Sequence, residues 1–356
     1  MPNKGLGMNL DDFRTLGRSG LRVSRFSLGA MTFGTERGWG STEQDARRVF
    51  DRYIERGGNF FDTADIYTSG TSEKMLGKFV SDSGVRDKAV IASKFTMSVD
   101  HANPNAGGNG RKNIYRALEG SLTRLGTDYV DIYWLHAWDM VTPVEEVLAT
   151  LNDLISEGKI RYFGLSDTPA WYAARMGTMA QAHCRNGPIA LQLSYSLLER
   201  NIEREHVPVA AEMEWGICAW SPLQGGLLTG KYRKDERSPD WRLELQKDNP
   251  ILTRSGPRLP RLIDETVRLA DEAGVTPAQL ALRWASERPG ITSLIIGART
   301  LAQLDENLDA LDISVPDSIL KQLDEISAIE LVQPYTFFAP PWSTAINGTK
   351  SIKGWR

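Results

Sequence analysis

Residues 59–67 read NFFDTADIY, a short apolar run that ends in ionisable side chains. Seven other short apolar runs occur in the chain, and runs of this length between turn signals are typical of buried strands. The eight predicted strands are Arg25–Ala30, Asn59–Ala64, Ala89–Lys94, Tyr129–His136, Ile160–Ser166, Ile189–Ser194, Gly216–Ser221 and Ser293–Gly297. The segments that lie between them decide which fold the strands form.

Helical periodicity separates the predicted strands. The segment Ser41–Gly57 opens with Ser-Thr-Glu and stops at a Gly-Gly pair, and Thr142–Gly158 has Pro and acidic residues in its first turn. Both are typical signals of helix boundaries. Further helices are predicted at Ser72–Ser81, Gly110–Leu125, Pro169–His183, Arg204–Trp215, Pro260–Ala273, Thr276–Glu287 and Leu301–Leu311.

Eight successive strand–helix units predict an α/β fold, a (β/α)8 TIM barrel with long loops at its C-terminal face. An open doubly wound sheet is the alternative on the pattern alone. No linker interrupts the series, so we expect residues 1–356 to form a single barrel unit. It divides into an N-terminal β-hairpin at 12–24, the barrel at 25–311, and an extra helix and C-terminal tail at 312–356. Lys231–Arg258 is predicted to be a long loop, and the tail beyond Leu331 is aromatic and non-periodic.

Composition excludes several classes of protein. Lys and Arg total 42 against 45 Asp and Glu, so there is no general attraction to nucleic acid or to an anionic membrane. No apolar run approaches the length of a membrane helix, and the first residues lack an apolar signal core, which predicts a cytoplasmic protein. Cys184 and Cys218 lack the spacing of metal ligands, so we expect two buried thiols and no metal site.

Polar residues end the predicted strands, and a barrel of this kind has its active site at those ends. Asp62, Lys94 and His136 close three successive strands, and Tyr67 follows the first of them. The phenol pKa of about 10 falls beside an ammonium group. We therefore predict Tyr67 as a general acid or base, Lys94 as the group that lowers its pKa, Asp62 as the partner of Lys94, and His136 as a second hydrogen-bonding group.

At these residues the sequence resembles the aldo-keto reductases, and the resemblance covers nearly the whole chain. Residues 14–24, RTLGRSGLRVS, look like the N-terminal hairpin of that family, and 59–67 with 72-SEKMLG-77 is a specific signature. The catalytic tetrad of the family falls on Asp62, Tyr67, Lys94 and His136. The resemblance implies reversible, NADPH-dependent reduction of an aldehyde or ketone to an alcohol, with Tyr67 delivering the proton.

The resemblance also implies a cofactor site. Ser166 and Gln192 match residues that hold the nicotinamide carboxamide, Trp220 matches the aromatic that stacks on the ring, and Asp167 replaces the usual Asn. Arg299 stands where a guanidinium can pair with a 2′-phosphate, which favours NADP(H) over NAD. The implied cofactor residues are Met31, Asp62, Ser166, Asp167, Gln192, Trp220, Ser221, Leu223, Gly225, Leu227, Lys231, Gly297, Arg299, Gln303, Glu306 and Asn307.

The substrate is predicted only by class. Trp39, Tyr67, His136 and Trp138 would surround the carbonyl group of a small molecule, and the aromatic tail could fold over the mouth, which suggests a bulky, partly apolar aldehyde or ketone. The resemblance is close to the branch that includes the voltage-gated potassium channel β subunits. A regulatory subunit that binds a nicotinamide cofactor is therefore the alternative, although the resemblance implies that those subunits lack the histidine kept here as His136. The sequence leaves open whether the protein forms a homo-oligomer.

Overall fold

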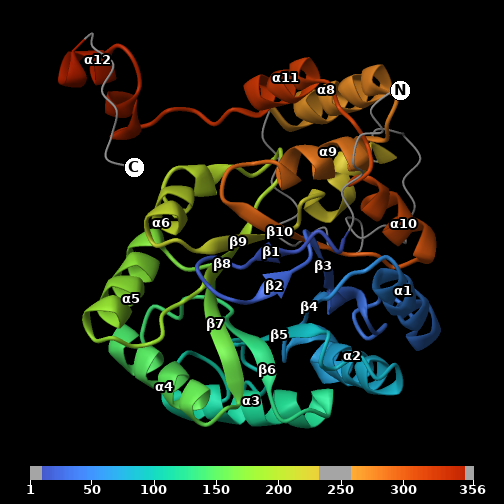
Figure 1. The fold of residues 1–356 in the computed structure, drawn as a ribbon, viewed down its shortest axis with the longest axis vertical. Helices are drawn as coiled ribbons and strands as arrows, with labels where there is room; N and C mark the ends of the chain where they lie inside the picture. Colours follow the sequence, from blue (N-terminus) through green and yellow to red (C-terminus); the bar gives the residue numbers. More distant parts are fainter. Residues whose placement is uncertain (1–9, 232–257, 349–356) are drawn as a thin grey trace.

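The computed structural model describes residues 10–231 and 258–348. Its centre is a closed barrel of parallel strands in the order β10-β3-β4-β5-β6-β7-β8-β9 (Figure 1). The strands are β3 (Phe26–Gly29), β4 (Phe60–Asp62), β5 (Val90–Phe95), β6 (Val130–Leu135), β7 (Ile160–Ser166), β8 (Ala190–Ser194), β9 (Gly216–Trp220) and β10 (Ile291–Ile296). The predicted (β/α)8 barrel is confirmed. The open sheet is wrong, because β10 pairs with both β9 and β3 and leaves no edge.

Helices surround the barrel (Figure 1). They are α1 (Glu43–Glu55), α2 (Thr71–Asp82), α3 (Arg111–Leu125), α4 (Val144–Ser156), α5 (Ala170–Ala182), α6 (His206–Glu212), α9 (Pro277–Ser286) and α10 (Leu301–Asp309). The short 3-10 turns are η1 (Ala30–Thr32), η2 (Tyr67–Gly70), η3 (Asn201–Glu203) and η4 (Gln224–Thr229). Two additional helices, α8 (Arg258–Ala273) and α11 (Asp317–Ser327), pack against each other.

Local chemistry sets several helix boundaries. The Thr42 hydroxyl accepts the Asp45 N–H at the start of α1. A capping box of Thr276 and Gln279 opens α9, satisfying N–H groups that have no partner within the helix. The predicted helix Arg204–Trp215 is too long at both ends, because Glu205 at the cap of α6 has non-helical backbone angles and α6 ends at Glu212.

Side chains alternate between the barrel interior and the surrounding helices. On β4 and β5, Phe60 and Ala92 belong to an interior apolar cluster, whereas Phe61 and Ile91 pack outward into the larger core. The same interior cluster includes residues of the antiparallel hairpin β1 (Arg14–Thr15) and β2 (Arg22–Val23) and its neighbours. The predicted hairpin is thus confirmed, and the period of two along each strand determines which strand-end residues point inward.

The thiols and the tail differ from expectation. Cys218 is buried, but Cys184 is exposed, because it lies in the turn that follows α5 rather than inside the helix.

The tail forms η6 (Tyr335–Phe338) and α12 (Trp342–Asn347), which stand out beside the barrel in Figure 1 instead of crossing it. Of the predicted loop Lys231–Arg258, residues 232–257 lie outside the described chain, and Arg258 already begins α8. In the described ranges, no helix is long and apolar enough to cross a membrane.

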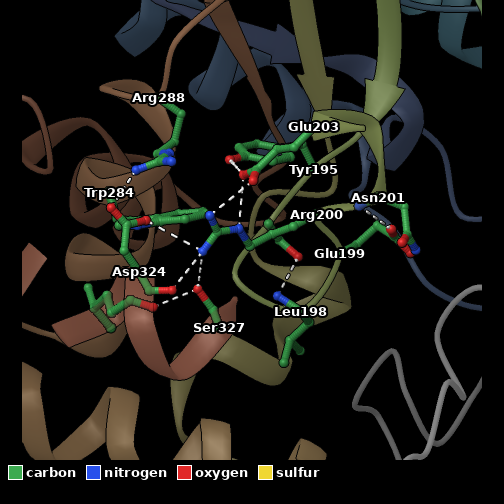
Figure 2. Close-up of polar contacts among 12 residues, drawn as sticks. Tyr195, Leu198, Glu199, Arg200, Asn201, Glu203, Trp284, Arg288, Asp324 and Ser327 are labelled. Carbon is green, nitrogen blue, oxygen red and sulfur yellow. Dashed lines mark hydrogen bonds and ion pairs between the residues drawn. The ribbon is translucent and has the colours of Figure 1, made fainter. Parts of the chain in front are cut away.

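A polar network joins the segment after β8 to α9 and α11 (Figure 2). The Arg200 guanidinium donates to both carboxylate oxygens of Glu203, at 2.9 and 3.0 Å, and to the Ser327 hydroxyl at 2.7 Å. It also lies over the Trp284 ring, with its central carbon 5.2 Å from the ring centre. The Trp284 indole in turn donates to Asp324 at 3.0 Å. Helix α11 therefore supports the loop that leaves the barrel mouth at β8.

Replacing Arg200 tests how much this network stabilises the fold. Arg200→Ala would leave the Glu203 carboxylate without its cation, whereas Asp324 would keep its ion pair with Arg288 at 2.6 Å. Breaking a fully buried pair costs about 3–5 kcal/mol. Because both carboxylates are partly exposed, we expect a loss of about 2–3 kcal/mol in the free energy of unfolding, measured by urea denaturation. Arg268→Ala removes a guanidinium from an exposed pair on α8 and should cost no more than about 1 kcal/mol. Equal losses would contradict the assigned role of Arg200.

Candidate active site

A buried ion pair lies at the C-terminal ends of β4 and β5. Lys94 has no exposed surface, and its ammonium donates to Asp62, to the Thr63 carbonyl oxygen at 2.8 Å and to the Tyr67 hydroxyl at 3.2 Å. These three acceptors match the three donors of an ammonium group. Burial opposes the charge, but Asp62 and Tyr67 hold the pKa of Lys94 above its ordinary value. The Thr63 carbonyl was not among the predicted site groups, because backbone oxygens leave no signal in the side-chain pattern.

Tyr67 and His136 complete the predicted tetrad in space. The two rings meet edge to face, with their centres 5.8 Å apart. Burial raises the pKa of Tyr67, whereas the adjacent Lys94 lowers it. Lys94 thus lowers the phenol pKa in the predicted direction, but burial has the larger, opposite effect, so the pKa of Tyr67 in the protein alone lies above its ordinary value. Burial, with Lys94 adding, lowers the pKa of His136 well below its usual range, so the imidazole is neutral at neutral pH.

Four residues predicted to hold a nicotinamide gather beside this pair. The Gln192 amide donates to Asp62 at 2.8 Å, and Ser166 on β7 pairs in register with Gln192 on β8. In the described chain, the buried Ser166 hydroxyl has no hydrogen-bond partner. The Trp220 indole at the end of β9 donates to Asp167 at 3.2 Å, while burial raises the pKa of Asp167 to about 6. The Ser166 hydroxyl and the Gln192 amide are suited to bind a carboxamide, and the Trp220 indole is suited to stack on an aromatic ring.

The loop after β9 has a left-handed backbone. Ser221, Gln224, Gly225 and Gly226 have φ values of 53°, 47°, 64° and 96°, and glycine reaches such values without steric cost. The predicted cofactor residues Leu223, Leu227 and Lys231 lie on this loop. Burial lowers the pKa of Lys231, and the nearby charge of Arg299 adds to this effect. Lys231 and Arg299 therefore lie within electrostatic range of one another, and two such cations suit an anionic ligand.

The turn after β10 carries Arg299. The Gln303 side chain accepts the Arg299 backbone N–H at 2.9 Å, and Asn307 donates to the Gly297 carbonyl at 3.4 Å. In this structure both side chains hold the turn itself, so they position Arg299. Glu306 is partly exposed on the same helix, α10. Met31 is partly exposed in η1, whose neighbour Thr32 donates to the Ala298 carbonyl at 3.0 Å and thereby ties η1 to this turn.

Of the predicted substrate residues, Tyr67 and His136 contact each other, and Trp138 contacts a further tryptophan. Trp138 meets Trp171 edge to face, with ring centres 5.4 Å apart, and its backbone N–H donates to the Asp167 carbonyl at 3.4 Å. Trp39 is buried, with only 5% of its surface exposed. Two further residues were not predicted: Trp171, and Arg37, whose guanidinium lies 5.8 Å from the centre of the Tyr67 ring. The only sequence signal of either was its position shortly after a predicted strand.

The arrangement is suited to moving a proton at the Tyr67 hydroxyl. An ammonium that is fixed in place contacts that hydroxyl, and a neutral imidazole lies beside the phenol ring. Across residues 10–231 and 258–348, no group of three His, Cys, Asp or Glu side chains is placed to hold a metal ion. The ammonium and the imidazole placed around the Tyr67 hydroxyl support acid–base chemistry by these side chains.

A second buried carboxyl, Asp65, lies on the segment that leads to Tyr67. It is 3% exposed, and within the described residues neither of its oxygens has a hydrogen-bond partner. Burial raises the pKa of Asp65 to about 7, and the neighbouring Glu73 adds to the rise while Arg124 opposes it. Glu73 is itself buried and accepts from Arg124 at 2.6 Å. Asp65 is therefore the member of this pair that lacks a counter-charge.

Comparisons with known proteins bear on the same region. A sequence model described as the aldo/keto reductase family matches residues 25–328. A probable voltage-gated potassium channel subunit beta of Oryza sativa subsp. japonica is 36% identical over 331 residues, covering 90% of this chain and 97% of that protein. The uncharacterized oxidoreductase YrpG of Bacillus subtilis is 35% identical over 325 residues, covering 88% and 95%. Norsolorinic acid reductase stcV of Emericella nidulans is 33% identical over 328 residues, covering 90% and 82%.

The pKa of Asp65 predicts how stability depends on pH. A carboxyl whose pKa is higher in the folded chain binds its proton more tightly there, so its stabilising effect is complete below about pH 4 and is lost as the pH rises through about 7. Asp65→Asn should therefore flatten the decrease in the free energy of unfolding between about pH 5 and about pH 8. Urea denaturation at both pH values measures this. Asp87→Asn, at an exposed carboxyl, should leave the slope unchanged; an unchanged slope in Asp65→Asn would contradict the prediction.

Proposed function

The chain belongs to the aldo/keto reductase family, and on that premise we propose that it is an NADPH-dependent reductase that converts an aldehyde or ketone to an alcohol, reversibly. Family membership makes it an oxidoreductase of carbonyl compounds. The cofactor preference and the proton donor are our proposal. The observation that carries it is the buried Lys94–Asp62 pair with the Tyr67 hydroxyl in contact with its ammonium.

The proposed mechanism assigns one task to each group of the chain. Tyr67 donates its proton to the oxygen of the carbonyl group, and Lys94 stabilises the phenolate that remains. Asp62 keeps Lys94 charged and in place. His136, neutral at working pH, contributes a second hydrogen bond to the same oxygen, which favours the charge that develops there.

The residues around Gln192 fit the nicotinamide end of the cofactor, which supplies the hydride when it is bound. Ser166 would hold the carboxamide together with Gln192 and Asp167, and Trp220 would stack on the ring. The charge of Arg299 acts on Lys231, so two cations lie in this region and support a phosphate site there. Arg299 is the candidate partner of a 2′-phosphate, and it is why we favour NADP(H) over NAD(H).

A regulatory subunit is the second candidate, because relatives from Oryza sativa and Arabidopsis thaliana are named as probable potassium channel β subunits. The Bacillus subtilis relative, at nearly the same identity, is named an oxidoreductase, and others are named norsolorinic acid reductases. The presence of His136 beside Tyr67 favours an enzyme here. Turnover that depends on Tyr67 would support the enzyme; absent turnover with co-purification of a membrane protein would support the subunit.

Removing the Tyr67 hydroxyl tests the proton donor. Tyr67→Phe should reduce carbonyl turnover by roughly 10²–10⁴-fold, the usual contribution of a positioned acid, while cofactor binding persists. Steady-state reduction of 4-nitrobenzaldehyde with NADPH measures the first effect, and fluorescence titration with NADPH measures the second. Lys94→Met should have a similar effect on turnover. The double variant should lose little more than either single one, since the two groups act as a unit. Near-normal turnover in Tyr67→Phe would refute the assignment.

Cofactor choice is tested at Arg299. If its guanidinium binds a 2′-phosphate, Arg299→Ala should weaken NADPH binding more than NADH binding by roughly 1.5–3 kcal/mol, the usual worth of a hydrogen bond to a charged group. Fluorescence titration with each cofactor gives the two dissociation constants, and NADH serves as the internal control. Equal losses for the two cofactors would show that Arg299 only supports the fold of the turn.

A further inference from the structure

We propose that Arg37 recognises an anionic group on the substrate, so that the preferred substrates are aldehydes or ketones that also carry a carboxylate. The inference rests on the proposed reductase function and specifies its substrate class. Arg37 lies in the loop between η1 and α1, and it is not one of the residues assigned to catalysis or to cofactor binding.

The guanidinium of Arg37 lies beside the proposed proton donor. It donates to the Ile66 carbonyl oxygen at 3.0 Å, and its central carbon is 5.8 Å from the centre of the Tyr67 ring. Its charge also contributes to the lowered pKa of His136, after the larger effects of burial and Lys94. A carbonyl oxygen at the Tyr67 hydroxyl would therefore place neighbouring atoms of the substrate near this cation.

The loop that carries Arg37 is fixed to the segment of Tyr67. The Thr68 hydroxyl donates to the Phe33 carbonyl at 2.8 Å, and the Thr71 hydroxyl donates to the Glu36 carboxylate. The end of the loop is closed by a hydrogen bond from the Ser41 N–H to the Thr32 carbonyl at 2.7 Å. Because these ties hold the loop on both sides of Arg37, the position of the cation relative to Tyr67 is set before any substrate binds.

Arg37 has no carboxylate partner in the described chain. Its neighbour Glu36 is engaged by Thr71, and Lys74 adds to the lowering of the Glu36 pKa by that hydrogen bond. The arginines of α1 differ in this respect, since Arg47 pairs with Asp51 at 2.8 Å. The charge of Lys94, the other cation near Tyr67, is matched by Asp62. Among the described residues, Arg37 is therefore an exposed guanidinium beside Tyr67 that has no carboxylate partner, and its planar donors suit a carboxylate.

A cofactor phosphate is the less suitable partner for Arg37. The cations assigned to the cofactor, Lys231 and Arg299, follow β9 and β10. Arg37 instead binds the backbone of Ile66 in the segment between β4 and α2, next to the atoms proposed to react. The ends of the Arg37 loop, at Thr32 and Ser41, contact the turn of Arg299. The Arg37 guanidinium itself, however, contacts the Ile66 backbone beside Tyr67, which favours a carboxylate a few bonds from the carbonyl carbon.

Matched substrates test the inference. The 2-, 3- and 4-carboxybenzaldehydes are compared with their methyl esters, which keep the aldehyde and the ring but remove the charge. For the best isomer, Arg37→Met should reduce kcat/KM on the acid by about tenfold or more, mainly through KM, and leave the ester within about twofold. Arg37→Lys should retain part of the preference. Arg48→Met, at an exposed guanidinium on α1, should change neither substrate.

Each contrary outcome shows whether the role of Arg37 or the proposed reductase function fails. Equal losses on acid and ester would mean that Arg37 only supports the loop, and weaker NADPH binding in Arg37→Met would make it a cofactor residue; either overturns the inference alone. Wild-type protein that reduces the esters with no preference for any acid also overturns it. If the wild type reduces neither acids nor esters, the proposed reductase function fails, and this inference fails with it.

Discussion

The buried ammonium of Lys94 is the constraint on which the arrangement of the barrel mouth depends. Removing a charge from water costs several kcal/mol even after relaxation, and the cost is offset only if every donor finds a well-placed acceptor. Asp62, the Thr63 carbonyl and the Tyr67 hydroxyl provide those acceptors. The parallel register of β4 and β5 holds them together, so the closed barrel is what makes this charge tolerable.

The remaining polar groups of the mouth are organised around that pair. Gln192 binds the second oxygen of Asp62, which links the nicotinamide side of the site to the proton donor. Helix α11, outside the eightfold pattern, supports the segment after β8 through Arg200. The Arg37 guanidinium, which has no carboxylate partner among residues 10–231 and 258–348, lies beside Tyr67, where a substrate would approach. Matched charges thus build the site, and this exposed cation offers binding energy to a ligand.

Differences between prediction and structure have local physical causes. The helix predicted at Arg204–Trp215 has a suitable composition, but the contacts of Arg200 and Glu203 hold the preceding residues in a different backbone. Gln303 and Asn307 share a helix face, as expected, yet each makes a hydrogen bond to the nearby backbone, since Gln303 accepts from Arg299 and Asn307 donates to Gly297. The phenol pKa of Tyr67 moves upward because the whole surrounding shell excludes water, a property that no short segment carries.

The sequence by itself determined the barrel and the identity of the strand-end residues. A period of two along each short strand places Asp62, Lys94 and Gln192 on one side, and eight repeats place all such residues at one end. Only the tertiary structure decided what those residues contact: the Thr63 carbonyl, the tie from Gln192 to Asp62, and the position of Arg37 over Tyr67. The reason is physical, since side-chain type and spacing are local properties, whereas burial and distance depend on every segment that packs around a group.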